Sequence, residues 1–423
     1  MIKRLLVLFI FSAGTVAWAQ NAGASGVKST TVPFVLDHNR IVIEADISLP
    51  GGESQRISAW VDNGNPDFYM SRRVATLLKL EVRCDERECQ VPPPKEISIG
   101  GMTISLDKVK EAKIPLKSPA AAAILAPGMS AEMNVPSTIL RNYDVLVDFP
   151  AHKLTLGQPG SLKFNGVNTK VTVNGANGLI EIPSEIEKKK KTTLGLDLGA
   201  SISLLTPELF ERLASAHPDW PHMTGAVGPA NMWGLDDETK WKVMRADRLQ
   251  YGPLFLTAVA VAEFPKDEAA SFEKRAGLPT SGLIASEALL NYRVGLDYAH
   301  AVVYFDVGRL FTFPDFDVIG LTLRPEDDGR FTILAIADLD GKPSVLTGAE
   351  GIQPGDRLVA VDNITTAGST MGQVWHMLGG DPGKQRMLTI EREGKQHSVL
   401  ATVQHFLGET DAAEDSKKKS KKR

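Results

Sequence analysis

The chain has 423 residues, 43% of them hydrophobic, and its 47 Lys and Arg against 51 Asp and Glu give a formal net charge of −4. A chain of this length is expected to fold as two or three domains, because a single core rarely organises so many residues. The slightly acidic balance argues against a nucleic-acid-binding protein, which would carry a strongly basic face.

The N-terminus has the pattern of a secretory signal. Lys3 and Arg4 precede an apolar run over residues 5–11, and Ala17-Trp18-Ala19 is a small-x-small cleavage pattern. The alternative, an uncleaved membrane anchor, is disfavoured because this run is much shorter than the roughly 20 residues that span a bilayer. We therefore expect residues 1–19 to be a signal peptide, and the mature protein to be exported to the periplasm or the medium without a membrane span.

The first chemical motif follows an apolar strand that ends at Asp62. The strand delivers this carboxylate into the turn Asp62-Asn63-Gly64, and Ser71 is placed to cap a helix whose apolar residues recur at helical spacing. Alternation over residues 41–47 and paired glycines at 51–52 and 100–101 indicate hairpins around this motif.

Cys84 and Cys89 are the only cysteines of the chain. In an oxidising compartment two cysteines this close are expected to form a disulfide at the tip of a hairpin. A metal site is the alternative, but no histidine lies near them in the sequence, so we expect no bound metal.

The motif around Asp62 recurs around Asp197. Another apolar strand ends in Asp197-Leu198-Gly199, and a helix-capping Thr206 follows at the same distance from the aspartate as before (71 − 62 = 206 − 197 = 9). Three further Asp-x-Gly triplets begin at residues 306, 327 and 381, but there ordinary turn chemistry explains the pattern.

A second repeat lies downstream of each aspartate. Residues 142–149 and 291–298 share Asn, Tyr, Val and Asp in register. The aspartates are offset by 135 residues (197 − 62) and the asparagines by 149 (291 − 142), so the second copy has gained 14 residues between the landmarks. The sequence therefore predicts an internal duplication, followed near its C-terminus by a further unit.

Two symmetry-related aspartates predict a definite chemistry. When two carboxyl groups meet across a pseudo-twofold axis, they can share one proton and activate a water molecule between them. That is the chemistry of peptide-bond hydrolysis, and Asp62 and Asp197 are the expected catalytic pair.

The two copies resemble the lobes of retropepsin-like and pepsin-like aspartic proteases, in the bacterial exported form that carries a C-terminal PDZ domain. The resemblance implies a mainly β fold with two tandem β-barrel lobes over residues 33–157 and 170–312. It also implies that Gly64 and Gly199 let backbone N–H groups approach the carboxylates, and that the Ser201 hydroxyl braces one of them. Residues 124–126 and 283–285 are similar to the family's later apolar segments.

The family has Thr or Ser directly after each aspartate, and its hydroxyl bridges the lobes beneath the carboxylates. Here these residues are Asn63 and Leu198. Asn63 has both a donor and an acceptor for such a bridge, whereas Leu198 has neither. An aspartic-type endopeptidase is the preferred interpretation, and a catalytically inactive relative that binds peptides or proteins is the alternative.

Active members of the family close a glycine-bearing hairpin, the flap, over the substrate. The resemblance points to residues 225–234 as the flap, with Gly228 and Gly234 as its flexible positions and Trp233 as an apolar platform. The alternative is a surface loop with its tryptophan packed beneath it.

Residues 317–405 resemble a bacterial PDZ domain, through a Gly-x-x-Pro-Gly-Asp motif over 351–356 and a helix over 370–378. The resemblance implies that Gly320, Leu321, Thr322 and Leu323 bind an extended peptide with a free C-terminus by strand addition. A structural cap on the second lobe is the alternative. Residues 406–423, which end in a basic run, are expected to be a disordered tail.

No phosphate-binding loop and no Gly-x-Ser-x-Gly nucleophile turn occurs in the sequence. We therefore expect no cofactor. The resemblance implies a polypeptide substrate or a peptide ligand as the partner, and we expect a monomer.

Overall fold

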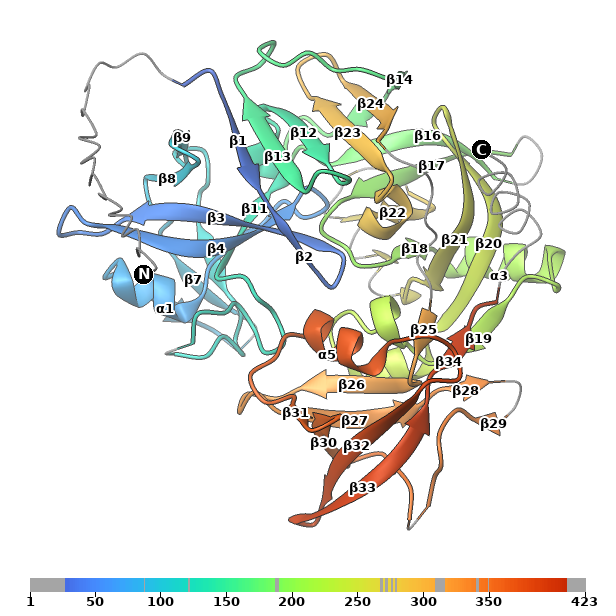
Figure 1. The fold of residues 1–423 in the computed structure, drawn as a ribbon. Helices are drawn as coiled ribbons and strands as arrows, with labels where there is room; N and C mark the ends of the chain where they lie inside the picture. The colour runs from blue at the N-terminus through green and yellow to red at the C-terminus, as the bar shows by residue number, and fades with distance from the viewer. Residues whose placement is uncertain are drawn as a thin grey trace, which may run out of the picture.

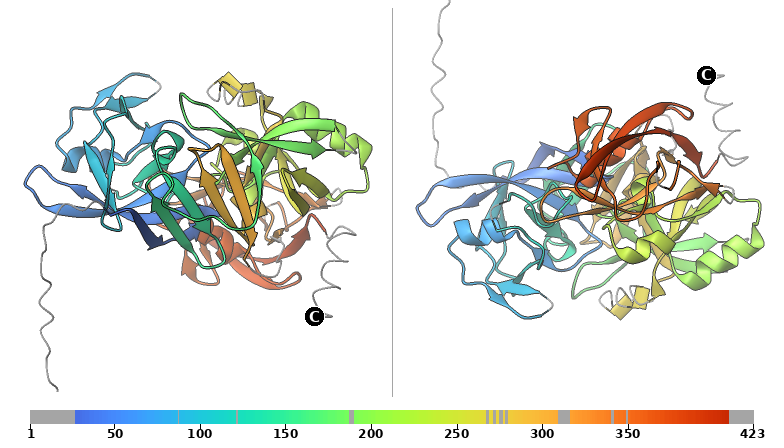
Figure 2. Two further views of the ribbon diagram at one scale, coloured as in Figure 1. Left: turned by 90° about the horizontal axis from the view of Figure 1, so that it is seen from above. Right: turned by 90° about the horizontal axis from the view of Figure 1, so that it is seen from below.

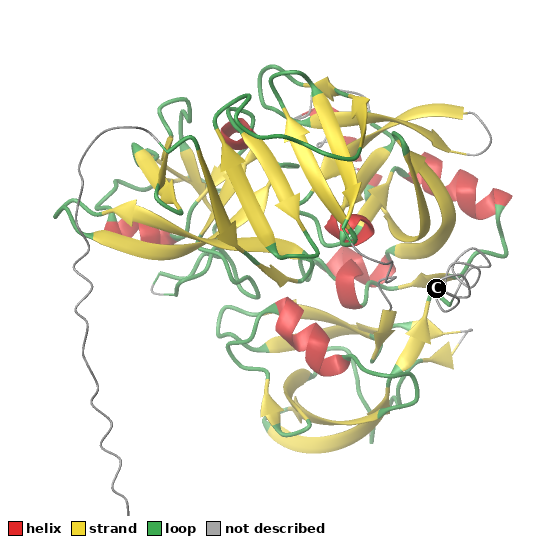
Figure 3. Ribbon diagram, turned by 45° about the horizontal axis from the view of Figure 1, so that its top comes forward, coloured by secondary structure: helices red, strands yellow, loops and turns green. Residues whose placement is uncertain are grey.

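The computed structural model describes residues 27–408 except 87, 121, 187–189, 267–268, 271–272, 275–276, 278–279, 309–315, 340–341 and 349. The expected signal peptide and residues 409–423 of the expected disordered tail lie outside the described residues. The start of that tail was placed too early, because Phe406 ends a strand and both Phe406 and Leu407 are buried in an apolar core. The chain is mainly β (Figure 3), and two lobes of strands in tandem are followed by a third unit with its own sheet (Figure 1). The expected mainly β, bilobal architecture is confirmed.

A six-stranded sheet joins the two lobes. Its strands, in spatial order, are β1 (Ser29–Pro33), β13 (Lys153–Gly157), β12 (Asp144–Asp148), β23 (Tyr292–Asp297), β24 (Val302–Val307) and β14 (Val167–Lys170). The central antiparallel pair, β12 and β23, contains the second sequence repeat, and Leu146 lies opposite Gly295. These two positions are related by the repeat offset itself (295 − 146 = 149), so the pseudo-twofold axis passes through this pair.

Lobe 1 consists of two sheets and two short helices. Its larger sheet contains β11 (Met133–Pro136), β4 (Ser54–Asp62), β3 (Arg40–Ser48), β8 (Glu96–Ile99) and β9 (Met102–Ser105), with β2 (Val35–Asp37) paired to β3. Its smaller sheet contains β5 (Phe68–Tyr69), β10 (Ala112–Ile114), β7 (Cys89–Val91) and β6 (Arg83–Cys84). The helices are α1 (Arg72–Leu77) and α2 (Ser137–Leu140).

Two local predictions for lobe 1 are confirmed. The Ser71 hydroxyl caps α1 by accepting from the Val74 N–H at 3.1 Å, which satisfies one of the free donors of the first turn. Cys84 and Cys89 form a disulfide with an S–S distance of 2.05 Å, and it joins the paired strands β6 and β7.

Lobe 2 is a single eight-stranded sheet that closes on itself, because β16 also pairs with β20. Its strands, in spatial order, are β15 (Thr172–Val173), β16 (Ile180–Ile186), β17 (Lys190–Asp197), β22 (Gly282–Ala285), β18 (Ser203–Leu205), β21 (Leu254–Glu263), β20 (Lys242–Tyr251) and β19 (His222–Thr224). It also has the helix α3 (Pro207–Ala216) and three 3₁₀ turns, η1 (Gly228–Ala230), η2 (Asp236–Lys240) and η3 (Ser286–Leu289).

Each aspartate strand pairs in parallel with a later strand of its own lobe. In lobe 2, Asp197 lies opposite Ala285, within the expected apolar segment 283–285. In lobe 1, Asp62 lies opposite Pro136 of β11. The expectation that residues 124–126 form the corresponding segment is therefore wrong. The segment with this role is residues 134–136, ten residues further on (136 − 126 = 10), and it obeys the repeat offset (285 − 136 = 149).

The third unit is built on a sheet with the order β26 (Leu321–Pro325), β27 (Phe331–Ile336), β30 (Arg357–Val361), β32 (Gln385–Arg392) and β33 (Lys395–Thr402). Its shorter strands are β25 (Phe316–Val318), β28 (Asp338–Leu339), β29 (Lys342–Pro343), β31 (Ile364–Thr365) and β34 (Gln404–Phe406). The helix α5 (Met371–Leu378) lies within the expected helical range 370–378 and begins at a capping box formed by Thr370 and Gln373.

The third unit lies against one face of the two lobes, with α5 and β26 nearest to them (Figures 1 and 2). Its contact with lobe 2 is a continuous apolar core, in which Phe316, Val318 and Phe406 pack with Ala226 and Val227 of lobe 2. Within the described residues, none of the helices is long and apolar enough to cross a membrane.

Candidate functional site

Asp62 and Asp197 meet at the interface between the lobes. They stand at the ends of β4 and β17 and line the same cavity. Each packs against the glycine of the opposite turn: a methyl group on Gly64 would lie 2.0 Å from Asp197 Cγ, and one on Gly199 would lie 2.4 Å from Asp62 Oδ1. Only glycine leaves room for this approach, so the two turns interlock around the carboxyl groups.

The surroundings of Asp62 favour its neutral form. The residue is 2% exposed. The pKa of Asp62 is raised well above its usual range, first because the carboxyl group is buried and second because the Asp197 carboxylate lies beside it. Arg40, the Asn134 side chain and the Gly64 N–H act in the opposite direction, but burial is the larger effect.

Asp197 lies in surroundings that stabilise negative charge. Its Oδ1 accepts hydrogen bonds from the backbone N–H groups of Gly199, at 2.8 Å, and Ala200, at 3.0 Å. Two backbone donors on one oxygen favour the ionised carboxylate. Asp62 is thus the member of the pair whose surroundings favour the proton, Asp197 is the member whose surroundings favour negative charge, and the two groups titrate as a unit.

Asn63 bridges the two lobes beneath the aspartates. Its Nδ2 donates to the Leu196 carbonyl at 2.8 Å, and its Oδ1 accepts from the Leu198 N–H at 2.7 Å. These backbone groups flank Asp197 on both sides. A single amide side chain thus fastens the turn of lobe 2 from lobe 1, whereas the Leu198 side chain packs into the apolar core.

The Ser201 hydroxyl is directed elsewhere. It donates its proton to the Pro229 carbonyl at 2.8 Å, and the Asn39 side chain donates to the Ser201 carbonyl at 3.1 Å. A hydroxyl group has one proton, so this one ties the aspartate turn to the loop after β19. It is the Gly199 and Ala200 backbone that braces Asp197.

The cavity in front of the aspartates is small and mostly apolar. It encloses about 120 Å³, and its walls include Trp60, Met232, Trp233, Trp241 and Phe264. The expectation of a hairpin flap is wrong in form, because residues 225–234 contain the short turn η1 and no strand. Trp233, however, does line the cavity.

The two expected glycines of this loop lie apart. Gly234 lies against β26, where a methyl group would be 2.6 Å from Pro325 Cδ. Gly228 lies against α5, where a methyl group would be 2.7 Å from Trp375 Nε1. Both have positive φ, 68° at Gly234 and 53° at Gly228, which favours glycine in any case.

Arg40 belongs to the site, and sequence reasoning missed it. The side chain is 4% exposed, and its guanidinium carbon lies 4.3 Å from the ring centre of Trp233 and 5.7 Å from that of Trp60. Nη2 donates to the Met232 carbonyl at 2.8 Å. A charged residue directly before the apolar strand 41–43 was the available signal, and its guanidinium makes a cation–π contact with the tryptophan over the aspartate cavity.

The four residues expected to bind a peptide lie along β26 and its approach. Gly320 is packed against Ser344 and Phe406, and the Thr322 hydroxyl donates to the Ala226 carbonyl at 2.7 Å. Leu321 and Leu323 are buried in the core of the third unit. We expected open backbone donors here, but the Leu323 N–H is bonded to the Asn231 Oδ1 of lobe 2 at 2.8 Å.

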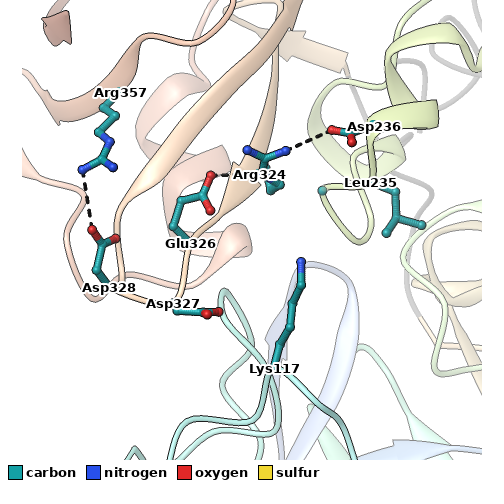
Figure 4. Close-up of a pocket in the computed structure, with 9 residues that line it drawn as sticks. Lys117, Leu235, Asp236, Arg324, Glu326, Asp327, Asp328 and Arg357 are labelled. Atoms are coloured by element: carbon teal, nitrogen blue, oxygen red, sulfur yellow. Dashed lines mark hydrogen bonds and ion pairs between the residues drawn. The ribbon is translucent and has the colours of Figure 1, made fainter. Parts of the chain in front are cut away.

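A second, more open pocket of about 520 Å³ lies where the three parts of the chain meet (Figure 4). Its charged side chains largely pair with one another: Arg324 bonds Asp236 and Glu326, both at 3.0 Å, and Arg357 lies 3.6 Å from Asp328. Such mutual pairing gives the pocket no chemistry comparable to that of the aspartate pair. Among the residues that the structure describes, no group of three or more His, Cys, Asp or Glu is placed to hold a metal ion.

No protein-family model matches the chain, and no curated protein matches its sequence. Among solved structures, the chain is similar to the aspartic proteinase from Irpex lacteus, with a TM-score of 0.39 and 12% sequence identity over 66% of this chain and 97% of that one.

Proposed function

We propose that this protein is an exported aspartic-type peptidase in which Asp62 and Asp197 activate a water molecule. The observation that carries the proposal is the reciprocal packing of Gly64 on Asp197 and of Gly199 on Asp62. It brings two carboxyl groups, which can share one proton, to one cavity between two symmetry-related lobes, and this arrangement is what acid–base hydrolysis needs.

In the proposed reaction the Asp197 carboxylate takes a proton from water as the water oxygen bonds to the carbon of the scissile amide. Asp62 gives its proton to the carbonyl oxygen, which would otherwise become an oxyanion. In the second step the protonated Asp197 gives its proton to the amine nitrogen, the carbon–nitrogen bond breaks, and one hydroxyl of the gem-diol intermediate returns its proton to Asp62 as it becomes the carbonyl of the product carboxylic acid. The two aspartates return to their starting state with one proton between them.

The third unit is proposed to be a PDZ-like module. The order of its strands, the capped helix α5 beside the edge strand β26, and the Gly-x-x-Pro-Gly-Asp motif support this. Export is supported by the N-terminal pattern together with the disulfide, because such bonds persist in oxidising compartments.

A second candidate function is peptide binding without hydrolysis. One observation favours it, because Leu198 provides no bridging hydroxyl beneath the aspartates. In this case the same aspartates would bind the peptide backbone without cleaving it.

The test compares wild type with Asp62→Asn and Asp197→Asn on reduced, unfolded casein from acid to neutral pH. Each variant removes half of an obligatory pair, so we expect a loss of cleavage of at least about 1,000-fold with the fold retained. Asp219→Asn, at an exposed carboxylate far from the cavity, is the matched control and should cleave normally. Cleavage that persists in both active-site variants would rule out the proposed mechanism.

A further inference from the structure

The loop over residues 225–235 contacts both the aspartate cavity and the third unit. Strand β26 lies at the edge of its sheet, where an extended peptide could add by backbone hydrogen bonds. Asn231 takes both of the backbone groups of Leu323: its Oδ1 accepts from the Leu323 N–H at 2.8 Å, and its Nδ2 donates to the Leu323 carbonyl at 3.0 Å. The side-chain amide thus occupies the place of an added strand.

Asn231 is held in this position by a buried carboxylate. Glu238 Oε2 accepts from the Asn231 Nδ2 at 2.6 Å, and Oε1 accepts from the Trp233 N–H at 2.7 Å. The Gly234 N–H also donates to this carboxylate, at 3.2 Å. The loop therefore wraps around Glu238 and presents the amide of Asn231 to β26.

The α5 side of the groove is also filled from the lobes. The Met371 N–H, in the first turn of α5, donates to the Gly128 carbonyl at 2.9 Å, and the Thr370 hydroxyl donates to Asp37 at 2.6 Å. Trp375 of α5 packs on Gly228 of the loop. The side of the third unit that carries β26 and α5 faces the lobes, as Figure 1 shows, and the loop contacts both elements, through Asn231 on Leu323 and Gly228 on Trp375.

The same loop covers the aspartates. Met232 and Trp233 line the cavity directly after Asn231, and the Met232 carbonyl is tied to Arg40. A cavity of about 120 Å³ is too small for a polypeptide. A polypeptide substrate needs more room at Asp62 and Asp197 than this cavity offers, and the loop supplies part of its wall.

We propose that Asn231 is the positioning residue through which the third unit holds this cover closed, and that an extended peptide with a free apolar C-terminus opens it by replacing Asn231 on β26. The groove would then take a peptide only in exchange for the loop. The catalytic consequence rests on the proposed peptidase function, but the exchange itself does not.

The experiment uses the full-length protein with Asn231→Ala, and with Thr322→Val as a second variant that removes the bond to Ala226. Asn168→Ala, at an exposed asparagine on β14, is the matched control. Asn231→Ala removes the two hydrogen bonds to Leu323 and the one to Glu238, which should raise the opening of the loop by at least about tenfold. Hydrogen exchange of the Trp233 and Gly234 amides should accelerate by that factor, and cleavage of unfolded casein should rise, mainly through a lower KM.

A synthetic peptide of about ten residues with an apolar C-terminus serves as the groove probe. It should bind Asn231→Ala about tenfold more tightly than wild type, because it no longer competes with the side-chain amide. A purely structural role for Asn231 predicts the opposite pattern: lower thermal stability, lower cleavage and unchanged peptide affinity. That pattern, or unchanged exchange at Trp233, would overturn the proposal.

The two proposals fail separately. If neither wild type nor Asn231→Ala cleaves casein, yet loop exchange and peptide affinity rise as expected, the peptidase function is wrong and the exchange stands. If wild type cleaves casein through its aspartates while loop exchange and peptide affinity do not respond to Asn231→Ala, the exchange is wrong and the peptidase function stands.

Discussion

Asn63 of lobe 1 and Leu198 of lobe 2 are joined across the lobe interface by a hydrogen bond of 2.7 Å from the Leu198 N–H to the Asn63 side chain. The same amide donates to the Leu196 carbonyl, so it fixes the turn that carries Asp197. Only Asn63 contributes a side chain to this bridge, because the Leu198 side chain has no polar group that could form a reciprocal hydrogen bond.

We predict that Asn63→Ala lowers the free energy of unfolding by about 2–4 kcal/mol, since two buried backbone groups lose their partner. Catalysis should fall by at least about 100-fold, because the turn of Asp197 is no longer fixed. Denaturant unfolding and casein cleavage measure the two effects, with Asn168→Ala as the exposed control. A variant as stable and as active as wild type would show that the bridge has no role.

A threonine at position 198 should not repair the site. Leu198 is 1% exposed and belongs to the main apolar core. Leu198→Thr removes apolar contacts and buries a hydroxyl, so we predict a loss of about 2–4 kcal/mol in the free energy of unfolding and no gain in cleavage. Increased cleavage at unchanged stability would mean that the missing hydroxyl does limit cleavage by the wild-type protein.

The two interlocking glycines allow a test that leaves the aspartates in place. A methyl group on Gly64 would overlap Asp197, and one on Gly199 would overlap Asp62. Gly64→Ala and Gly199→Ala should each separate the carboxyl groups and reduce cleavage by about 100-fold or more, while unfolding shifts by only about 1–3 kcal/mol. Gly51→Ala, which meets no atom within 4 Å, is the control. Full activity in either site variant would contradict the close approach.

Glu287 gives a prediction about pH. Burial raises the pKa of Glu287 from 4.5 to about 7, although its Oε1 accepts from the Ser203 N–H and hydroxyl. The native state therefore binds the proton of Glu287 more tightly than the unfolded state does. The resulting contribution to the free energy of unfolding is complete below pH 4.5 and is lost as pH rises through about 7.

Glu287→Gln cannot ionise at this position. Its stability relative to wild type should rise with pH by about 1.4 kcal/mol per unit between the two pKa values, and reach about 3 kcal/mol above pH 7. Glu111→Gln, at an exposed position, should show no such trend. Comparing each variant with wild type separates the effect of Glu287 from that of His38. Burial lowers the pKa of His38 to about 3, so its contribution to stability changes with pH in the opposite direction.

The duplication could be predicted from the sequence because the residues that indicate it lie close together in the chain. The strand before each aspartate, the capping hydroxyl and the Asn-Tyr repeat all lie within short segments, and the structure pairs the two repeat strands with each other. The segment 124–126 was misassigned because three apolar residues are a weak pattern. The repeat offset of 149 would have led from Ala285 to Pro136 instead.

The contacts around the cavity could not be predicted because the residues that make them lie far apart in the sequence. Arg40 meets Trp233, and Asn231 meets Leu323, through pairings that no periodicity or motif marks. The loop after β19 was expected to be a hairpin from the family resemblance. Its form is set by the buried Glu238, which takes three hydrogen bonds from the loop and keeps it out of a sheet.

The central claim is that Asp62 and Asp197 stabilise a transition state for amide hydrolysis. The most direct measurement compares the affinities of two otherwise identical peptides, one with an ordinary amide and one with a statine-type secondary alcohol in its place. An enzyme binds the alcohol at least about 100-fold more tightly, because the hydroxyl mimics the attacked carbonyl. We predict this preference in wild type and its loss in Asp62→Asn and Asp197→Asn. Equal affinity of wild type for both peptides would contradict the claim and identify a peptide-binding protein.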